Sequence, residues 1–125
     1  MQKEFISTED APKAVGPYSQ GVAFGSLVFT SGQLPINPVT GILEQDIRVA
    51  TTQVIKNVQA ILEAAGSSLN NVLKATVLLK NMDDFAAMNE VYSGFFGDNP
   101  PARICFQVCK LPMDACVEME VVAFK

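Results

Sequence analysis

A chain of 125 residues is the size of one domain, so we expect a single domain spanning residues 1–125. Its formal charge of −4 and its pI of about 4.6 disfavour nucleic acid as a partner, because contact with a phosphate backbone relies on a basic surface. The sequence contains no histidine, which excludes Ser-His-Asp and Cys-His catalytic sites and histidine-ligated metals. Carboxylate, arginine, backbone amide and water remain to carry any chemistry.

Hydrophobic residues make up 49% of the chain and charged residues 18%, a high apolar share for a small monomer, so we expect burial between subunits. No run approaches the roughly 20 apolar residues that span a bilayer, and residues 1–10 lack the apolar core of a signal sequence. The three cysteines, Cys105, Cys109 and Cys116, match no zinc spacing. We therefore expect a soluble, cytoplasmic protein with free thiols, no metal and no membrane partner.

In the first half of the chain, residues 18–24 and 27–31 are predicted as the strands of a hairpin that turns at Gly25 and Ser26. A helix is predicted from the N-cap Asp46 onward, because apolar residues recur there at helical spacing. Gly66 is the predicted stop of this helix.

The second half of the chain contains three more strands and a second helix. The strands are predicted at residues 72–79, 103–109 and 116–124, and the helix at residues 82–96. On the first of these strands Leu73, Ala75, Val77 and Leu79 share one side. The element order predicts a two-layer α/β fold with a mixed sheet and two helices on one face.

The alternation of side chains divides the last two strands into two faces. We expect the core face to hold Ile104, Phe106, Val108, Val117, Met119, Val121 and Ala123. We expect the uncovered face to hold Lys74, Thr76, Leu78, Arg103, Cys105, Gln107, Glu118, Glu120 and Val122. Such a mixed surface suits an oligomer whose sheets face one another around polar clefts.

Arg103 is the first candidate for chemistry, because its planar guanidinium fork binds a small carboxylic acid in two places. The alternative is a structural salt bridge to Glu118 or Glu120. Those two glutamates share a strand face, so one is a candidate to bind or activate a water while the other pairs with Arg103 or Lys74. Two solvated carboxylates are the alternative. Cys105 is a candidate nucleophile, with an inert buried thiol as the alternative.

Seven segments of the chain carry a recognisable pattern: residues 11–21 (APKAVGPYSQG), 30–35 (TSGQLP), 62–66 (LEAAG), 72–77 (VLKATV), 84–89 (DFAAMN), 101–105 (PARIC) and 111–120 (LPMDACVEME). Together they resemble the reactive intermediate deaminase family, also called the YjgF family. They follow the family order and span nearly the whole chain.

This resemblance implies a chorismate mutase-like α/β protomer that assembles as a homotrimer with three clefts between subunits. It also implies a cofactor-free hydrolase that converts reactive 2-imino acids and their enamine tautomers, such as 2-iminopropanoate and 2-iminobutanoate, to 2-oxo acids and ammonia. Two alternatives stay open: a non-catalytic, regulatory protein that binds small carboxylates, and a translation inhibitor or ribonuclease. The acidic pI and the lack of histidine oppose the latter.

The resemblance also implies roles for individual residues. Arg103 matches the arginine that grips the substrate carboxylate, helped by the backbone amide of Cys105. Glu118 matches the residue that positions or activates the attacking water, which leaves Glu120 a structural role. The residues expected to line the cleft, from the neighbouring subunit, are Tyr18, Ser31, Gly32 and Asn89. This chain departs from the family pattern at Ile104, where a small residue is common.

Overall fold

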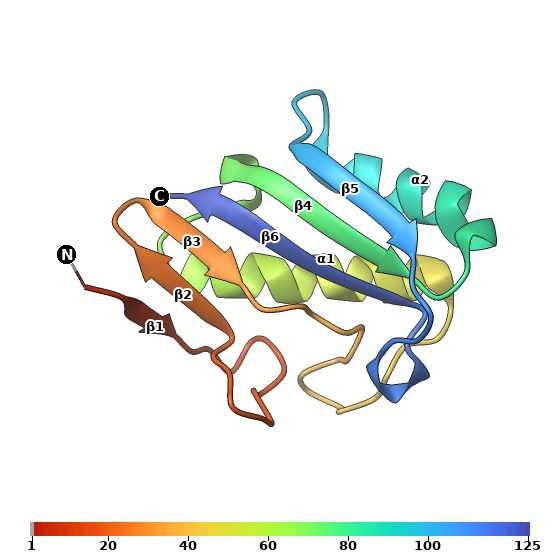
Figure 1. Cartoon of the computed structure of the whole chain (residues 1–125), viewed down its shortest axis with the longest axis horizontal. Helices are drawn as coiled ribbons and strands as arrows, with labels where there is room; N and C mark the ends of the chain where they lie inside the picture. The colour runs from red at the N-terminus through yellow and green to blue at the C-terminus, as the bar shows by residue number, and fades with distance from the viewer. Residues whose placement is uncertain (1) are drawn as a thin grey trace.

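The computed structural model describes residues 2–125, which form one six-stranded sheet in the order β1-β2-β3-β6-β4-β5. Strands β4 and β5 are parallel and the other neighbouring pairs are antiparallel. Both α-helices lie behind the sheet in the view of Figure 1, so the predicted two-layer α/β fold with a mixed sheet is confirmed. The bounds are β1 Glu4–Ile6, β2 Gly21–Phe24, β3 Leu27–Thr30, α1 Ile47–Ala64, β4 Val72–Leu79, α2 Phe85–Phe96, β5 Ala102–Gln107 and β6 Val117–Phe124.

The predicted hairpin, the strand at residues 72–79 and both helices are present. Gly25 turns the hairpin with a φ of 60° and Gly97 ends α2 with a φ of 62°, in a region that side chains with a Cβ rarely adopt. The second helix differs at its start, where Met82–Asp84 forms a 3-10 turn before α2. Strand β1 was not predicted, because three residues are too few to show an alternation.

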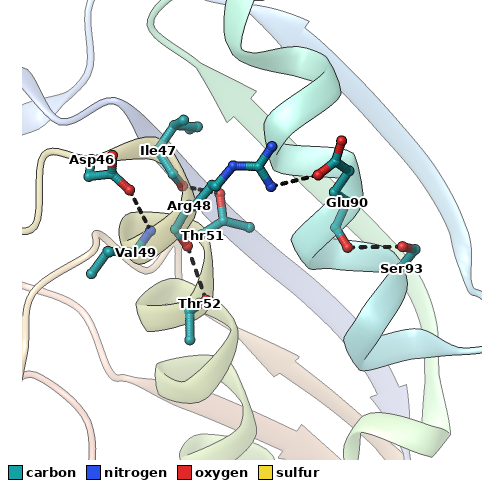
Figure 2. A network of polar contacts seen from close by, with 8 residues as sticks. All are labelled: Asp46, Ile47, Arg48, Val49, Thr51, Thr52, Glu90 and Ser93. Atoms are coloured by element: carbon teal, nitrogen blue, oxygen red, sulfur yellow. Dashed lines mark hydrogen bonds and ion pairs between the residues drawn. The ribbon is translucent and has the colours of Figure 1, made fainter.

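The first turn of α1 is capped by Asp46, whose Oδ2 accepts a hydrogen bond from the Val49 amide at 3.1 Å. Figure 2 shows this cap beside the ion pair of Arg48 Nη1 with Glu90 Oε2, at 2.7 Å, which joins α1 to α2. Both charged side chains are more than half exposed, so the pair contributes at most about 1 kcal/mol. No helix within residues 2–125 combines the length and apolarity needed to span a bilayer.

The core lies between the helices and one face of the sheet. Helix α1 contributes fully buried side chains at helical spacing: Val54, Ile55, Val58, Ile61 and Leu62. Strand β6 contributes alternate residues, as predicted: Val117, Met119, Val121 and Ala123. The direction of β6, and with it the direction of Glu118 and Glu120, is therefore confirmed.

Strand β5 faces the opposite way from the prediction. In the register with β4, Arg103 pairs with Ala75 and Cys105 pairs with Val77, and paired residues point to the same face. Ala75 and Val77 are fully buried beneath the helices. Arg103 and Cys105 therefore lie on the helix-covered face, and the prediction that they lie on the uncovered face is wrong.

The alternate residues of β5 correct the prediction in the same way. Ile104 and Phe106, predicted to face the core, are each 47% exposed and lie on the uncovered face. Gln107 turns to the helix side, where its Oε1 accepts a hydrogen bond from the Met82 amide at 2.9 Å. Strand β5 is the edge of the sheet, so its side chains lie at the margin of the helical layer. A long polar side chain on the covered face, such as that of Arg103 or Gln107, therefore still reaches solvent.

The prediction that Leu73 shares a face with Ala75, Val77 and Leu79 is also wrong, because Leu73 is exposed whereas Val72 is buried. A shift of register between Val72 and Lys74 interrupts the alternation at this point. From Lys74 onward the pairing with β6 places the predicted residues on the uncovered face: Lys74, Thr76, Leu78, Glu118, Glu120 and Val122.

Candidate functional site

Arg103 lies against α2. Its Nη1 donates a hydrogen bond to Asn89 Oδ1 at 2.7 Å. Its Cζ lies 4.7 Å from the ring centre of Tyr92 and 5.6 Å from that of Phe85, distances at which an aromatic face attracts a cation. We call Phe85, Asn89, Tyr92, Arg103 and Cys105 the Arg103 cluster. The groups that hold the guanidinium are all neutral.

Two members of this cluster, Phe85 and Tyr92, lie within the helix predicted at residues 82–96 and were not predicted as site residues. The spacing of positions 85, 89 and 92 places both aromatic residues on one helical stripe with Asn89. A polar amide between two aromatic residues on one stripe was the available signal for this cluster.

No carboxylate within residues 2–125 forms an ion pair with Arg103. The ion pairs of these residues are Arg48 with Glu90, Lys80 with Asp114, and Lys125 with Glu4. The alternative of a salt bridge from Arg103 to Glu118 or Glu120 within the chain is therefore wrong. A guanidinium has five N–H donors, so donors remain for an external carboxylate.

Cys105 has a thiol whose pKa is raised by burial, although the nearby Arg103 guanidinium lowers it in part. A raised pKa keeps the thiol protonated near neutral pH, so the inert thiol is favoured over a thiolate nucleophile. The backbone amide of Cys105 is a separate candidate for binding, because β5 is an edge strand. Alternate amides of an edge strand point away from the sheet and are free to bind.

A hollow of about 1120 Å³ gathers a second set of predicted site residues. Tyr18, Ser31, Gly32 and Glu118 line it, together with Glu120. We call it the Glu118 hollow. The side chains of the Arg103 cluster are not part of its lining.

The position of Gly32 against Glu118 coincides with an irregularity in the pairing of strands β3 and β6. Phe29 pairs with Val122, whereas Gln33 pairs with Met119, so four steps along one chain segment span three along the other. One extra residue in such a pair forms a bulge, and bulges redirect side chains. The extra residue here lies between Phe29 and Gln33, in the segment that contains Ser31 and Gly32.

Gly32 within the bulge lies directly against Glu118. A Cβ built on Gly32 would collide with the Glu118 carboxylate and lie 3.0 Å from its Cδ. Ser31 Oγ donates to the Ser19 carbonyl at 2.5 Å, which ties the bulge to the segment that carries Tyr18. Glycine at position 32 therefore leaves the space that the carboxylate occupies.

The carboxyl group of Glu118 has a pKa raised mainly by burial and secondly by the charge of Glu120. Its ionised form is consequently a stronger base than an exposed glutamate. This is the property that a residue activating a water requires.

Two buried amides that were not predicted as site residues hold the loops around the hollow. Gln20 exchanges two hydrogen bonds with the backbone of Thr8, at 2.7 and 3.0 Å. Asn57 Nδ2 donates to the carbonyls of Leu34 and Ile36, at 3.1 and 3.0 Å. Buried amides need hydrogen-bond partners. An asparagine on the apolar stripe of α1 was therefore the sequence signal that Asn57 holds a loop.

The Arg103 cluster and the Glu118 hollow belong to opposite faces of the sheet. Glu118 pairs with Leu78, and Leu78 pairs with Phe106 on the uncovered face. Arg103 lies on the covered face beneath α2. One protomer therefore does not bring Arg103 and Glu118 together. The prediction that Asn89 acts from a neighbouring subunit is wrong for its contact with Arg103, which is made within the chain.

The sequence model of the family described as Endoribonuclease L-PSP matches residues 8–125. The chain belongs to this family. A RutC family protein of Pyrococcus abyssi is similar to this chain at 54% identity, over 100% of the chain and 99% of the relative. A Salmonella typhimurium protein named 2-iminobutanoate/2-iminopropanoate deaminase is 45% identical over 96% of both. The resemblance to reactive intermediate deaminases is thereby confirmed.

A solved structure agrees with the fold of this Endoribonuclease L-PSP family member. The Escherichia coli protein TdcF, crystallised with bound serine, superposes with a TM-score of 0.94 at 44% identity, and 98% of each chain is covered. Within residues 2–125, no three histidine, cysteine, aspartate or glutamate side chains are grouped as the ligands of a metal ion would be.

Proposed function

We propose that the chain hydrolyses 2-imino acids, such as 2-iminopropanoate and 2-iminobutanoate, and their enamine tautomers to 2-oxo acids and ammonia, without a cofactor. The observation that carries the proposal is the state of Arg103: a partly buried cation held by Asn89 and two aromatic rings, without an acidic partner in residues 2–125. Such a cation suits the carboxylate of a small organic acid.

Two relatives support this choice of substrate. The Salmonella typhimurium relative is named for the same reaction. The solved structure of TdcF contains serine, a small molecule with the carboxylate that Arg103 is proposed to bind. In this proposal the Cys105 backbone amide supplies a further hydrogen bond to the carboxylate, and Tyr18, Ser31 and Asn89 complete the site.

The chemistry needs one base and one water. Glu118 takes a proton from the water as the water oxygen forms a bond to C2 of the imine, and it passes this proton to the imine nitrogen, which gives a neutral carbinolamine. Glu118 then takes the proton of the carbinolamine hydroxyl and passes it to the nitrogen as the C2–N bond breaks, so the 2-oxo acid and ammonia leave and Glu118 is ionised again. Imines hydrolyse unaided, so orientation and one general base supply enough acceleration.

The site in this proposal is shared between protomers, because Arg103 and Glu118 lie on opposite faces of one sheet. The Arg103 cluster of one protomer faces the Glu118 hollow of its neighbour, and three protomers close a trimer with three clefts. The uncovered face supports this assembly because it carries large apolar side chains without a helical cover: Phe29, Leu78, Ile104, Phe106 and Val122.

The test of this function measures ammonia release in an assay coupled to a threonine dehydratase, which generates 2-iminobutanoate. We expect the chain to accelerate the release and Arg103→Ala to reduce the acceleration at least about tenfold, since a charge-assisted pair contributes roughly 1.5–3 kcal/mol. Arg48→Ala is the matched control, because it removes the same cation from an exposed ion pair and leaves the acceleration in place.

Two outcomes contradict the proposal. The first is an Arg103→Ala variant with the acceleration of the wild type. The second is a wild type that binds 2-oxobutanoate without accelerating ammonia release, which favours a non-catalytic binding protein.

The family description names an endoribonuclease, so RNA cleavage belongs in the same series of assays. The formal charge of −4 and the absence of histidine oppose this activity. Cleavage that persists in a double variant, Arg103→Ala with Glu118→Ala, would point to a contaminating nuclease.

A further inference from the structure

Tyr92 is the aromatic residue nearest to the guanidinium of Arg103. Its ring centre lies 4.7 Å from Arg103 Cζ, whereas that of Phe85 lies 5.6 Å away. The ring of Tyr92 in turn packs on Phe96, with 4.5 Å between centroids. Tyr92 is only 6% exposed, so its ring has a fixed place in the core.

The hydroxyl group of Tyr92 has no hydrogen-bond partner among residues 2–125, although it is buried. A buried hydroxyl without a partner destabilises a fold, and a phenylalanine would avoid this loss. The stabilising part of Tyr92 is therefore its ring, which contacts both Arg103 and Phe96.

The contacts of Arg103 divide its guanidinium into a held part and a free part. Asn89 takes a hydrogen bond from Nη1, and the two rings restrict the guanidinium from positions 85 and 92 of one helix. An arginine side chain otherwise samples many rotamers, and fixing them before a ligand arrives improves binding.

We propose that Tyr92 is a positioning residue, which acts through its ring face to hold the Arg103 guanidinium in the orientation that receives a substrate carboxylate. This inference rests on the proposed function, since it assigns to Arg103 the binding of a carboxylate. Asn89 holds one nitrogen of the guanidinium with a single hydrogen bond, and the ring of Tyr92 adds a second restraint on the group.

The experiment measures the dissociation constant of 2-oxobutanoate by titration calorimetry on the full-length protein. Tyr92→Leu is expected to raise this constant about tenfold, which corresponds to ~1.4 kcal/mol. Tyr92→Phe keeps the ring and is expected to bind within twofold of wild type while unfolding at a higher temperature. Phe95→Leu is the matched control: it makes the same kind of change on α2, at a residue that does not contact the guanidinium.

Phe85→Leu keeps the inference testable if Tyr92→Leu does not fold. It removes the more distant ring and is expected to raise the dissociation constant about threefold. The inference would be overturned by an unchanged dissociation constant in folded Tyr92→Leu, or in Phe85→Leu where Tyr92→Leu does not fold. An increase in Tyr92→Phe or in Phe95→Leu as large as that in Tyr92→Leu would also overturn it. Arg103→Ala separates the two proposals. If Arg103→Ala still binds 2-oxobutanoate, the proposed function is contradicted. If Arg103→Ala loses binding while Tyr92→Leu binds normally, only the role of Tyr92 is contradicted.

Discussion

Gly32 leaves space for the side chain of Glu118, which a residue with a Cβ at position 32 would enter. A methyl group at position 32 would overlap the Glu118 carboxylate, but the far end of a glutamate side chain rotates away without disturbing the backbone. No positive φ restricts position 32. The effect of a substitution should therefore fall on the position of the base and spare the fold.

Gly32→Ala is accordingly expected to lower kcat by at least about tenfold, since 1.4 kcal/mol of lost transition-state stabilisation has this effect. The free energy of unfolding should change by less than about 1 kcal/mol, as for most substitutions that leave the core intact. Steady-state kinetics and urea unfolding on the same preparation measure both quantities. A variant that loses stability and keeps its kcat would show that the carboxylate is not the base.

Glu118 also predicts how activity depends on pH. Burial and the neighbouring Glu120 raise the pKa of Glu118, and only the ionised carboxylate is able to take a proton from water. The value of kcat/KM should therefore rise with pH through an inflection above the usual range of glutamate. Glu120→Gln should move that inflection to lower pH, because it removes one of the two causes of the raised pKa.

The same pKa shift predicts the pH dependence of stability. The folded state holds the Glu118 proton to a higher pH than the unfolded state, so the contribution of this group to stability is present at low pH and is lost as pH rises through its raised pKa. Glu118→Gln should stabilise the fold near pH 7 and have no such effect near pH 4. Equal effects of Glu118→Gln at both pH values, in thermal unfolding, would contradict this assignment.

The sequence was sufficient to name individual site candidates, but it did not show which of them lie next to one another in the fold. The side-chain alternation of β5 was predicted correctly, but not which face of β5 meets the helices. Arg103 suggested an open cleft because it is charged, yet its neighbours on α2 provide a ring face and an amide that suit a cation. Those neighbours lie 11 to 18 positions away in the sequence, so only the docking of α2 on β5 brings them to Arg103.

Helices were predicted more accurately than strands because their signals are local. The cap at Asp46 and the glycines at positions 66 and 97 act within one turn of the helix ends. The bulge between Phe29 and Gln33 depends on the register with β6, about 90 positions later. No local pattern around Gly32 indicates this register.

Helix α2 contains an exposed glycine, Gly94, that has no structural requirement for glycine. A Cβ at this position meets nothing within 4 Å, and its φ is not positive. Gly94→Ala is expected to raise the free energy of unfolding by about 0.5–1 kcal/mol, because alanine loses less backbone entropy in a helix.

Urea unfolding of Gly94→Ala beside Gly97→Ala checks this expectation. Gly97 has a φ of 62°, so alanine there should lower the free energy of unfolding by about 1 kcal/mol. A stabilised Gly97→Ala, or a destabilised Gly94→Ala, would mean that the end of α2 differs from the one described.

The whole molecule has its two sets of site residues on opposite faces of one sheet, and the uncovered face is rich in large apolar side chains. Phe106 lies on the uncovered face, on the edge strand β5, and is 47% exposed. A glutamate there would have to be desolvated in any sheet-to-sheet contact, at a cost of several kcal/mol. If the chain assembles as the proposed trimer, Phe106→Glu should therefore reduce its solution mass to that of one 13.5 kDa protomer.

Light scattering after size exclusion measures this mass, and the coupled ammonia assay shows its consequence. Acceleration should disappear in Phe106→Glu although Arg103 and Glu118 are unaltered, because each protomer would then present only half of the site. Val39→Glu introduces the same charge on a loop residue that is 91% exposed, and it should change neither mass nor activity. A monomeric Phe106→Glu with full activity would place the complete site within one chain, against the opposite directions of Arg103 and Glu118 in the sheet.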